Sequence, residues 1–91
     1  MMPLYAVICR DKPGRVETRA ATRPAHLDWL AAHGGVQFAG PLIEDGAPVG
    51  SLVVIEAEDL AAAKAWVATD PYAAADVFAA VEVTEWKKAI G

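Results

Sequence analysis

Two short apolar runs decide the fold of this 91-residue chain: "PLYAVICR" at residues 3–10 and "SLVVIEA" at residues 51–57. Both runs contain β-branched residues, and the first ends at the turn signal "DKPG", so each predicts a β-strand. Successive side chains of a strand point to opposite faces of its sheet. Both faces of both runs are apolar, so the sheet that contains them is expected to need cover on both sides.

The segment after the first run predicts a helix. Thr18 or Thr22 is expected to cap it, with Pro24 in the first turn. Its apolar stripe is Leu27, Leu30 and Ala31, with Leu27 at the centre, and the glycine pair at 34–35 supplies the stop signal.

The remaining elements follow from similar signals. Residues 36–43 predict a strand, and its internal glycine and proline favour an edge position. A hairpin loop is expected at 44–50, before the second apolar run. Asp59 is expected to cap a helix over 60–68 that buries Leu60, Ala63 and Val67, and "DPY" should end it. Alternating side chains over 79–90 predict the last strand.

The order β-α-β-β-α-β predicts one α+β domain over residues 1–91 with a ferredoxin-like fold. Two right-handed crossovers place both helices on one face of a four-stranded antiparallel sheet, with the first and third strands central. The other apolar face then has no cover within the chain. A twofold homodimer that packs sheet on sheet is therefore expected.

Composition narrows the classes of function. Apolar residues make up 55% of the chain and charged residues 22%, which is typical of a folded domain. The net charge is −4 and the eight Lys and Arg are scattered, which argues against nucleic-acid binding. Cys9 is the single cysteine and is interpreted as a buried structural thiol. With two histidines seven apart, the chain shows no zinc-ligand spacing.

Neither a cofactor nor a membrane is indicated by sequence motifs. The chain shows no phosphate-binding loop, no dinucleotide fingerprint and no C-x-x-C redox motif, so no cofactor or metal is expected. It also shows no targeting segment and no apolar run long enough to span a bilayer. A cytoplasmic location is therefore expected.

His26 and Asp70 are the residues best suited to chemistry. His26 is expected about 100° from Leu27, at the border of the buried stripe, where a side chain is held by packing and still reaches a cleft. A boundary histidine with an ordinary hydrogen bond is the alternative. Asp70 precedes a proline at a helix end, where turn stabilisation alone could explain it. His33 lies near a helix C-terminus and is expected to favour the helix dipole and the last carbonyls.

Other residues could bind a substrate. Arg23 could pair with a carboxylate or recognise an anionic substrate, or it could be a solvated surface charge. Ser51 and the backbone around Gly40 and Pro41 are candidates for polar contacts, and Tyr72 or Trp29 for an aromatic wall.

The chain resembles the YCII-related domain family along nearly its whole length. The matching pieces are "RPAHLDWL" (23–30), "AGPL" (39–42), "GSLVVIEAEDLAAAKAW" (50–66) and "TDPY" (69–72). The resemblance implies a dimeric ferredoxin-like α+β barrel. It also implies that His26 and Asp70 line a cleft and form the active site. At least one branch of the family is linked to dehydrochlorination of chlorinated hydroquinones.

Two functions remain open at this point. In the first, the protein is a lyase or isomerase acting on a small organic molecule: Asp70 fixes the tautomer of His26, and the free ring nitrogen serves as general acid and base. In the second, it is a non-catalytic dimeric module that binds a small ligand or another protein. The absence of a nucleophile, a metal set and a cofactor fingerprint motivates the second.

Overall fold

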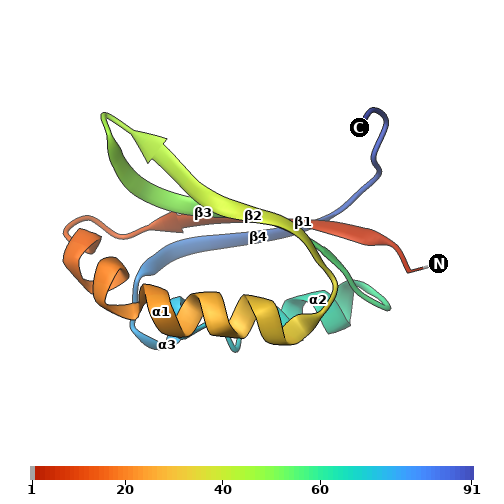
Figure 1. Ribbon diagram of the computed structural model, residues 1–91, viewed down its shortest axis with the longest axis horizontal. Coiled ribbons are helices and arrows are strands. Elements are labelled where there is room, and N and C mark those ends of the chain that lie inside the picture. Colours follow the sequence, from red (N-terminus) through yellow and green to blue (C-terminus); the bar gives the residue numbers. More distant parts are fainter. Residues whose placement is uncertain (1) are drawn as a thin grey trace.

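The computed structural model describes residues 2–91 and shows a four-stranded antiparallel sheet with every helix of that range on one face (Figure 1). The strands are β1 (Leu4–Asp11), β2 (Val36–Glu44), β3 (Ala47–Glu56) and β4 (Phe78–Trp86), and the helices are α1 (Val16–His33), α2 (Leu60–Val67) and α3 (Pro71–Ala74). The strand order β2-β3-β1-β4 places the first and third strands at the centre and the second at an edge. The ferredoxin-like α+β fold is therefore confirmed.

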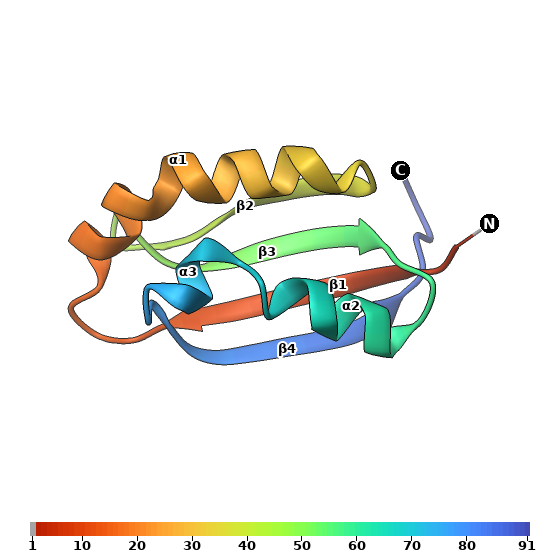
Figure 2. The same cartoon turned by 90° about the horizontal axis from the view of Figure 1, so that it is seen from below.

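The core lies between the sheet and the helices. Tyr5, Val7 and Cys9 of β1 and Val53 and Ile55 of β3 face the helices and are each at most 4% exposed. Seen from the helix side, α1 runs along β2 and β3, whereas α2 lies over β1 and β4 (Figure 2). α1 is therefore the long helix that faces β2 and β3.

The opposite face of the sheet is also apolar, as the strand pattern predicts. Leu4, Ala6 and Ile8 lie on this outer face and are half-buried within the single chain. Val54 beside them is only 3% exposed. Phe38 and Trp86 come from the two edge strands, β2 and β4. Their rings meet edge to face, with the ring centroids 6.2 Å apart.

The predicted start of the first helix is wrong. The helix begins at Val16, and Pro24 lies in its interior instead of its first turn. Thr18 and Thr22 are not caps, since the hydroxyl of Thr22 donates to the Thr18 carbonyl within the helix at 2.8 Å. A proline at such a position removes one helical hydrogen bond. The helix continues through Pro24, and hydrogen bonds from Arg19 to Asp11 and between His26 and Asp70 anchor it on either side.

The predicted buried stripe of this helix is also wrong. Leu27 is 44% exposed, and the buried residues of α1 are Arg19 and His26, two turns apart on one face. The sequence pattern predicts that the stripe around Leu27 is buried, because the most apolar face of a helix normally packs against the core. Here the face that turns toward the sheet is partly polar because it lines a cavity.

The end of β2, the start of β3 and the end of β4 also differ from the predictions. The loop between β2 and β3 is not 44–50 but only Asp45 and Gly46, so β3 begins at Ala47. Both turn residues have positive φ, 51° and 78°, which is the backbone that a tight two-residue hairpin requires. The last strand ends at Trp86, and residues 87–90 do not extend it.

The second helix follows its predicted signal. The carboxylate of Asp59 accepts the amide N–H of Ala62 at 2.8 Å, which is a normal N-cap. Ala63 and Val67 are buried, but Leu60 is 41% exposed and does not belong to the core. The short α3 was not predicted, and its N-cap is Asp70. Among residues 2–91, no helix has the length and apolar character of a transmembrane span.

Cys9 is expected to resist alkylation in the folded protein. It is 1% exposed, and its burial raises the pKa of the thiol to about 12. At pH 8 the folded protein then holds about a thousandfold less thiolate than it would with an ordinary cysteine, and the thiolate is the reactive form. Labelling with iodoacetamide should therefore be at least about 100-fold slower in native protein than in guanidinium-unfolded protein. Labelling rates within tenfold of each other would contradict this burial.

Candidate active site

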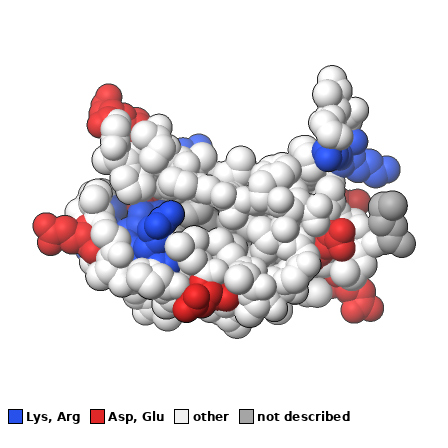
Figure 3. Space-filling view, viewed as in Figure 1, with Lys and Arg blue, Asp and Glu red and all other residues white. Residues whose placement is uncertain are grey.

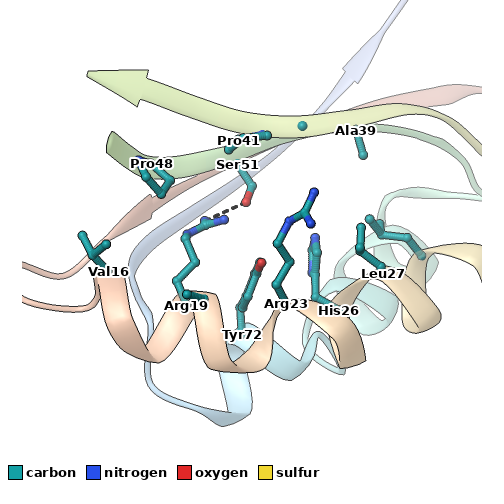
Figure 4. Close-up of a pocket in the computed structure, with 13 residues that line it drawn as sticks. Val16, Arg19, Arg23, His26, Leu27, Ala39, Pro41, Pro48, Ser51 and Tyr72 are labelled. Carbon is teal, nitrogen blue, oxygen red and sulfur yellow. Dashed lines mark hydrogen bonds between the residues drawn. The ribbon is translucent and has the colours of Figure 1, made fainter. Parts of the chain in front are cut away.

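A cavity of about 340 Å³ lies between α1 and the β2–β3 half of the sheet. Its volume is in the range of natural small-molecule pockets, near the lower end. Arg19, Arg23 and His26 point into it from α1, and Ser51 faces them from β3 (Figure 4). The remaining lining residues are mostly apolar or small: Val16, Ala20, Leu27, Leu30, Ala39, Gly40, Pro41, Pro48 and Tyr72.

His26 and Asp70 are hydrogen-bonded to each other at the wall of this cavity. His26 Nδ1 lies 2.9 Å from Asp70 Oδ1, and the two residues are 6% and 3% exposed. The same carboxylate oxygen accepts the amide N–H of Tyr72 at 2.9 Å, so Asp70 also caps α3. The carboxylate makes Nδ1 the donor of the His26 ring. Nε2 is then the nitrogen that can exchange a proton with a ligand, and the ring points into the cavity (Figure 4).

The position of His26 differs from the prediction of a border residue. Because α1 turns Arg19 and His26 toward the sheet, the His26 ring is buried and forms part of the cavity wall. Tyr72 packs against it with the ring centroids 4.0 Å apart and the planes 20° from parallel. This stack, together with the Asp70 hydrogen bond, holds the imidazole in one orientation.

Tyr72 also contacts Arg19. The guanidinium carbon of Arg19 lies 4.4 Å from the centroid of the Tyr72 ring, within the range of a cation–π contact. Burial raises the pKa of Tyr72, although the positive charge of Arg19 opposes this shift. The phenol is therefore neutral near pH 7 and offers an O–H group at the cavity wall.

Sequence reasoning missed Arg19. Its Nε and Nη2 atoms donate to the two carboxylate oxygens of Asp11 at 2.7 and 3.0 Å, and both side chains are 6% exposed. Burial alone would lower the pKa of Arg19, but the hydrogen bond and charge of Asp11 raise it above its ordinary value. Nη2 also donates to Ser51 Oγ at 2.8 Å. The available signal was the seven-residue spacing from Arg19 to His26, which the predicted helix start obscured.

The five residues predicted to bind substrate lie together. Arg23, Gly40, Pro41, Ser51 and Tyr72 all line the cavity. Two of them come from β2, one from β3, one from α1 and one from α3.

Of the two residues predicted as an aromatic wall, Tyr72 lines the cavity and Trp29 does not. Trp29 does not line the cavity but stacks on Trp66 of α2, with ring centroids 3.8 Å apart and planes at 8°. Its indole N–H donates to the hydroxyl of Thr69 at 2.9 Å. Trp29 therefore ties α1 to the residue that precedes Asp70.

His33 takes a local role at the end of its helix, although not by the predicted contacts. Its Nδ1 accepts the amide N–H of Gly35 at 2.9 Å, so it binds a donor beyond the helix and not the last carbonyls. Its ring also packs on Trp66 at 4.5 Å. Within residues 2–91, no group of three or more His, Cys, Asp or Glu side chains is placed to hold a metal ion.

Known proteins resemble this chain over nearly its whole length. Protein YciI of Escherichia coli O6:H1 is 39% identical over 95 residues, covering 93% of this chain and 97% of the relative. The structure of 5-chloro-2-hydroxyhydroquinone dehydrochlorinase (TftG) of Burkholderia phenoliruptrix AC1100, in complex with 2,5-dihydroxybenzoquinone, superposes with a TM-score of 0.83 at 31% identity, covering 92% and 93% of the two chains.

A more distant structure shares the fold alone. The NE2512 protein of Nitrosomonas europaea has a TM-score of 0.60 at 21% identity, over 99% of this chain and 94% of its own. The sequence pattern of the YCII-related domain matches residues 3–87, a span that holds all the cavity residues. The chain belongs to the YCII-related domain family.

Proposed function

We propose that this protein is a lyase of the dehydrochlorinase type that acts on a small cyclic organic molecule in the cavity beside His26. The observation that carries the proposal is the buried hydrogen bond between His26 Nδ1 and Asp70 Oδ1, at 2.9 Å, with the imidazole at the cavity wall. A histidine oriented in this way is suited to general acid–base catalysis.

The proposed elimination needs a base that accepts a proton while chloride leaves the substrate. Elimination of hydrogen chloride removes a proton and a chloride ion from one substrate molecule. Nε2 of His26 takes the proton, the electron pair of the broken bond to hydrogen forms a new π bond, and the C–Cl pair leaves with chloride. The carboxylate of Asp70 stabilises the imidazolium that forms. A positioned base contributes about 10²–10⁴ in rate, which is sufficient for an activated substrate.

Similarity to TftG supports this reaction type. TftG is a 5-chloro-2-hydroxyhydroquinone dehydrochlorinase, and its structure covers nearly the whole of this chain at 31% identity. The cavity of about 340 Å³ has room for a compound of one ring.

Chloride release from 5-chloro-2-hydroxyhydroquinone tests the proposal. The wild-type protein is expected to release one chloride per substrate consumed, faster than the rate in buffer. Release at the buffer rate would contradict a dehydrochlorinase. Equal release by wild type and His26 variants would contradict the role of His26.

We also propose that the protein forms a homodimer through the outer face of its sheet. Leu4, Ala6, Ile8 and Leu52 form an apolar strip there, and every helix of residues 2–91 covers the opposite face (Figure 1). Phe38, beside this strip, is 50% exposed in the single chain. A second copy supplies an identical apolar face, which a twofold sheet-on-sheet packing would bury.

Sedimentation at about 10 µM is expected to give twice the 9.6 kDa mass of the chain. Ile8→Lys should shift the protein to monomer, because it places a charge in the middle of the strip opposite Glu82, where a lysine is tolerated in the single chain. Ala61→Lys on the exposed surface of α2 is the matched control and should remain dimeric. A monomeric wild type would contradict the dimer.

A further inference from the structure

Arg23 places a positive charge at the cavity, and no acidic side chain among residues 2–91 pairs with it. Arg19, four residues earlier, is matched by Asp11, and His26 by Asp70. Arg23 is exposed, lines the cavity and has no ion-pair or hydrogen-bond partner within residues 2–91. The chain as a whole carries a net charge of −4, so this local excess of positive charge runs against the balance of the protein.

Ser51 adds a hydrogen-bond donor to the opposite wall. The guanidinium of Arg19 can only donate, so the hydroxyl oxygen of Ser51 must accept in their 2.8 Å hydrogen bond. The Ser51 proton is then left to donate elsewhere, and the side chain is 3% exposed and faces the cavity (Figure 4). The hydrogen bond from Arg19 thus leaves the Ser51 hydroxyl proton available to a ligand in the cavity.

The cavity wall as a whole lacks negative charge. Its polar side chains are Arg19, Arg23, His26, Ser51 and Tyr72. The two arginines, Ser51 and Tyr72 carry N–H or O–H donors, whereas His26 gives its Nδ1 proton to Asp70 and presents Nε2 to the cavity. Among residues 2–91 no carboxylate belongs to the wall, because Asp11 and Asp70 lie behind Arg19 and His26. Figure 3 shows basic side chains grouped beside the first half of α1, with acidic side chains to the left of this group and below it.

From these contacts we infer that the cavity selects a small organic anion, with an ionised oxygen held between Arg23 and Ser51 and a flat apolar body against the remaining wall. The inference rests on the proposed function, because it states that the substrate of the proposed lyase is negatively charged. Arg23 is a specificity-determining residue in this arrangement, and Ser51 is its neutral partner across the cavity.

The same arrangement helps the proposed proton transfer. Arg23 lies three residues before His26, so both side chains leave α1 on the same side. An oxygen bound by Arg23 is then close to the imidazole. Negative charge that develops on this oxygen when a proton departs is stabilised by the guanidinium, and the low polarity of the surrounding wall strengthens that interaction.

The test compares two probes of nearly equal shape, benzoate and neutral benzamide, by calorimetric or NMR titration at pH 7. Benzoate is expected to bind roughly tenfold or more tightly than benzamide, as is typical for a hydrogen bond assisted by charge. Arg23→Gln should abolish this preference and Arg23→Lys should retain most of it. Lys64→Gln on α2, outside the cavity, is the control for a general loss of positive charge and should leave the preference intact.

Equal binding of the two probes, no binding of either, or an unchanged preference in Arg23→Gln would each overturn the inference. Because binding is measured without turnover, the result is separate from that of the chloride assay. Benzoate preference without chloride release would support the anion site and contradict the dehydrochlorinase. Chloride release without benzoate preference would support the dehydrochlorinase and contradict the anion site.

Discussion

Replacing His26 with glutamine is expected to reduce turnover by about 10²–10⁴-fold while the protein remains folded. The amide of glutamine can still donate to Asp70 Oδ1, which now receives hydrogen bonds from His26 and from the Tyr72 amide. It cannot accept a proton at neutral pH, so the catalytic role is lost and most of the packing is kept. Steady-state kinetics of chloride release should show the loss mainly in kcat, with thermal unfolding measured alongside.

His26→Ala and Asp70→Asn separate catalysis from structure. His26→Ala should lower turnover as far as the glutamine variant, and should also lower the melting temperature because it leaves a gap beside Tyr72. Asp70→Asn keeps an oxygen to cap the Tyr72 amide but removes the charge that orients His26, so a smaller fall in turnover is expected. A glutamine variant with more than a tenth of wild-type turnover would favour a purely structural histidine, as would a loss of stability without a loss of rate.

Asp11→Ala is expected to destabilise the fold by about 3–5 kcal/mol, because it leaves the guanidinium of Arg19 buried without a counter-ion. Small domains have a total free energy of unfolding of about 5–15 kcal/mol, so this single change would leave a substantial unfolded fraction. Urea denaturation followed by tryptophan fluorescence measures the loss directly.

A double variant gives the matched control. Asp11→Leu combined with Arg19→Met removes both charges and fills similar volume, so its stability should be much closer to wild type than that of Asp11→Ala. Asp76→Asn removes the carboxylate that pairs with Lys12 and Arg15. Those charges remain largely in water, so only a slight change is expected. An Asp11→Ala variant as stable as Asp76→Asn would show that burial does not make the Asp11–Arg19 pair important.

The order of the elements could be predicted because each strand carries its own local signal. The runs at 3–10 and 51–57 are apolar on both faces, and the structure places them at the centre of the sheet with half-buried side chains on the outer face. The boundaries of the elements were less predictable. The turn at Asp45 and Gly46 depends on two positive φ angles, and the surrounding glycines and prolines suggested a longer loop.

The site was predictable only in part. The family motifs pointed to His26 and Asp70, and the structure places the two side chains 2.9 Å apart. Hydrophobic periodicity put Leu27 in the core, whereas the structure turns Arg19 and His26 inward. Periodicity assumes that a helix buries its most apolar stripe, and this fails where the helix face encloses a cavity with polar side chains.

The sequence by itself determined the class of fold, the two central strands and the apolar character of both sheet faces, since these depend on residues close together in the chain. The tertiary structure alone decided which charges are matched. Arg19 meets Asp11 and Ser51 only when β1, α1 and β3 assemble, and Arg23 is left at the cavity without a counter-ion among residues 2–91. Pairing of buried charges depends on distances of a few ångströms between distant segments, and local patterns carry no information on those distances.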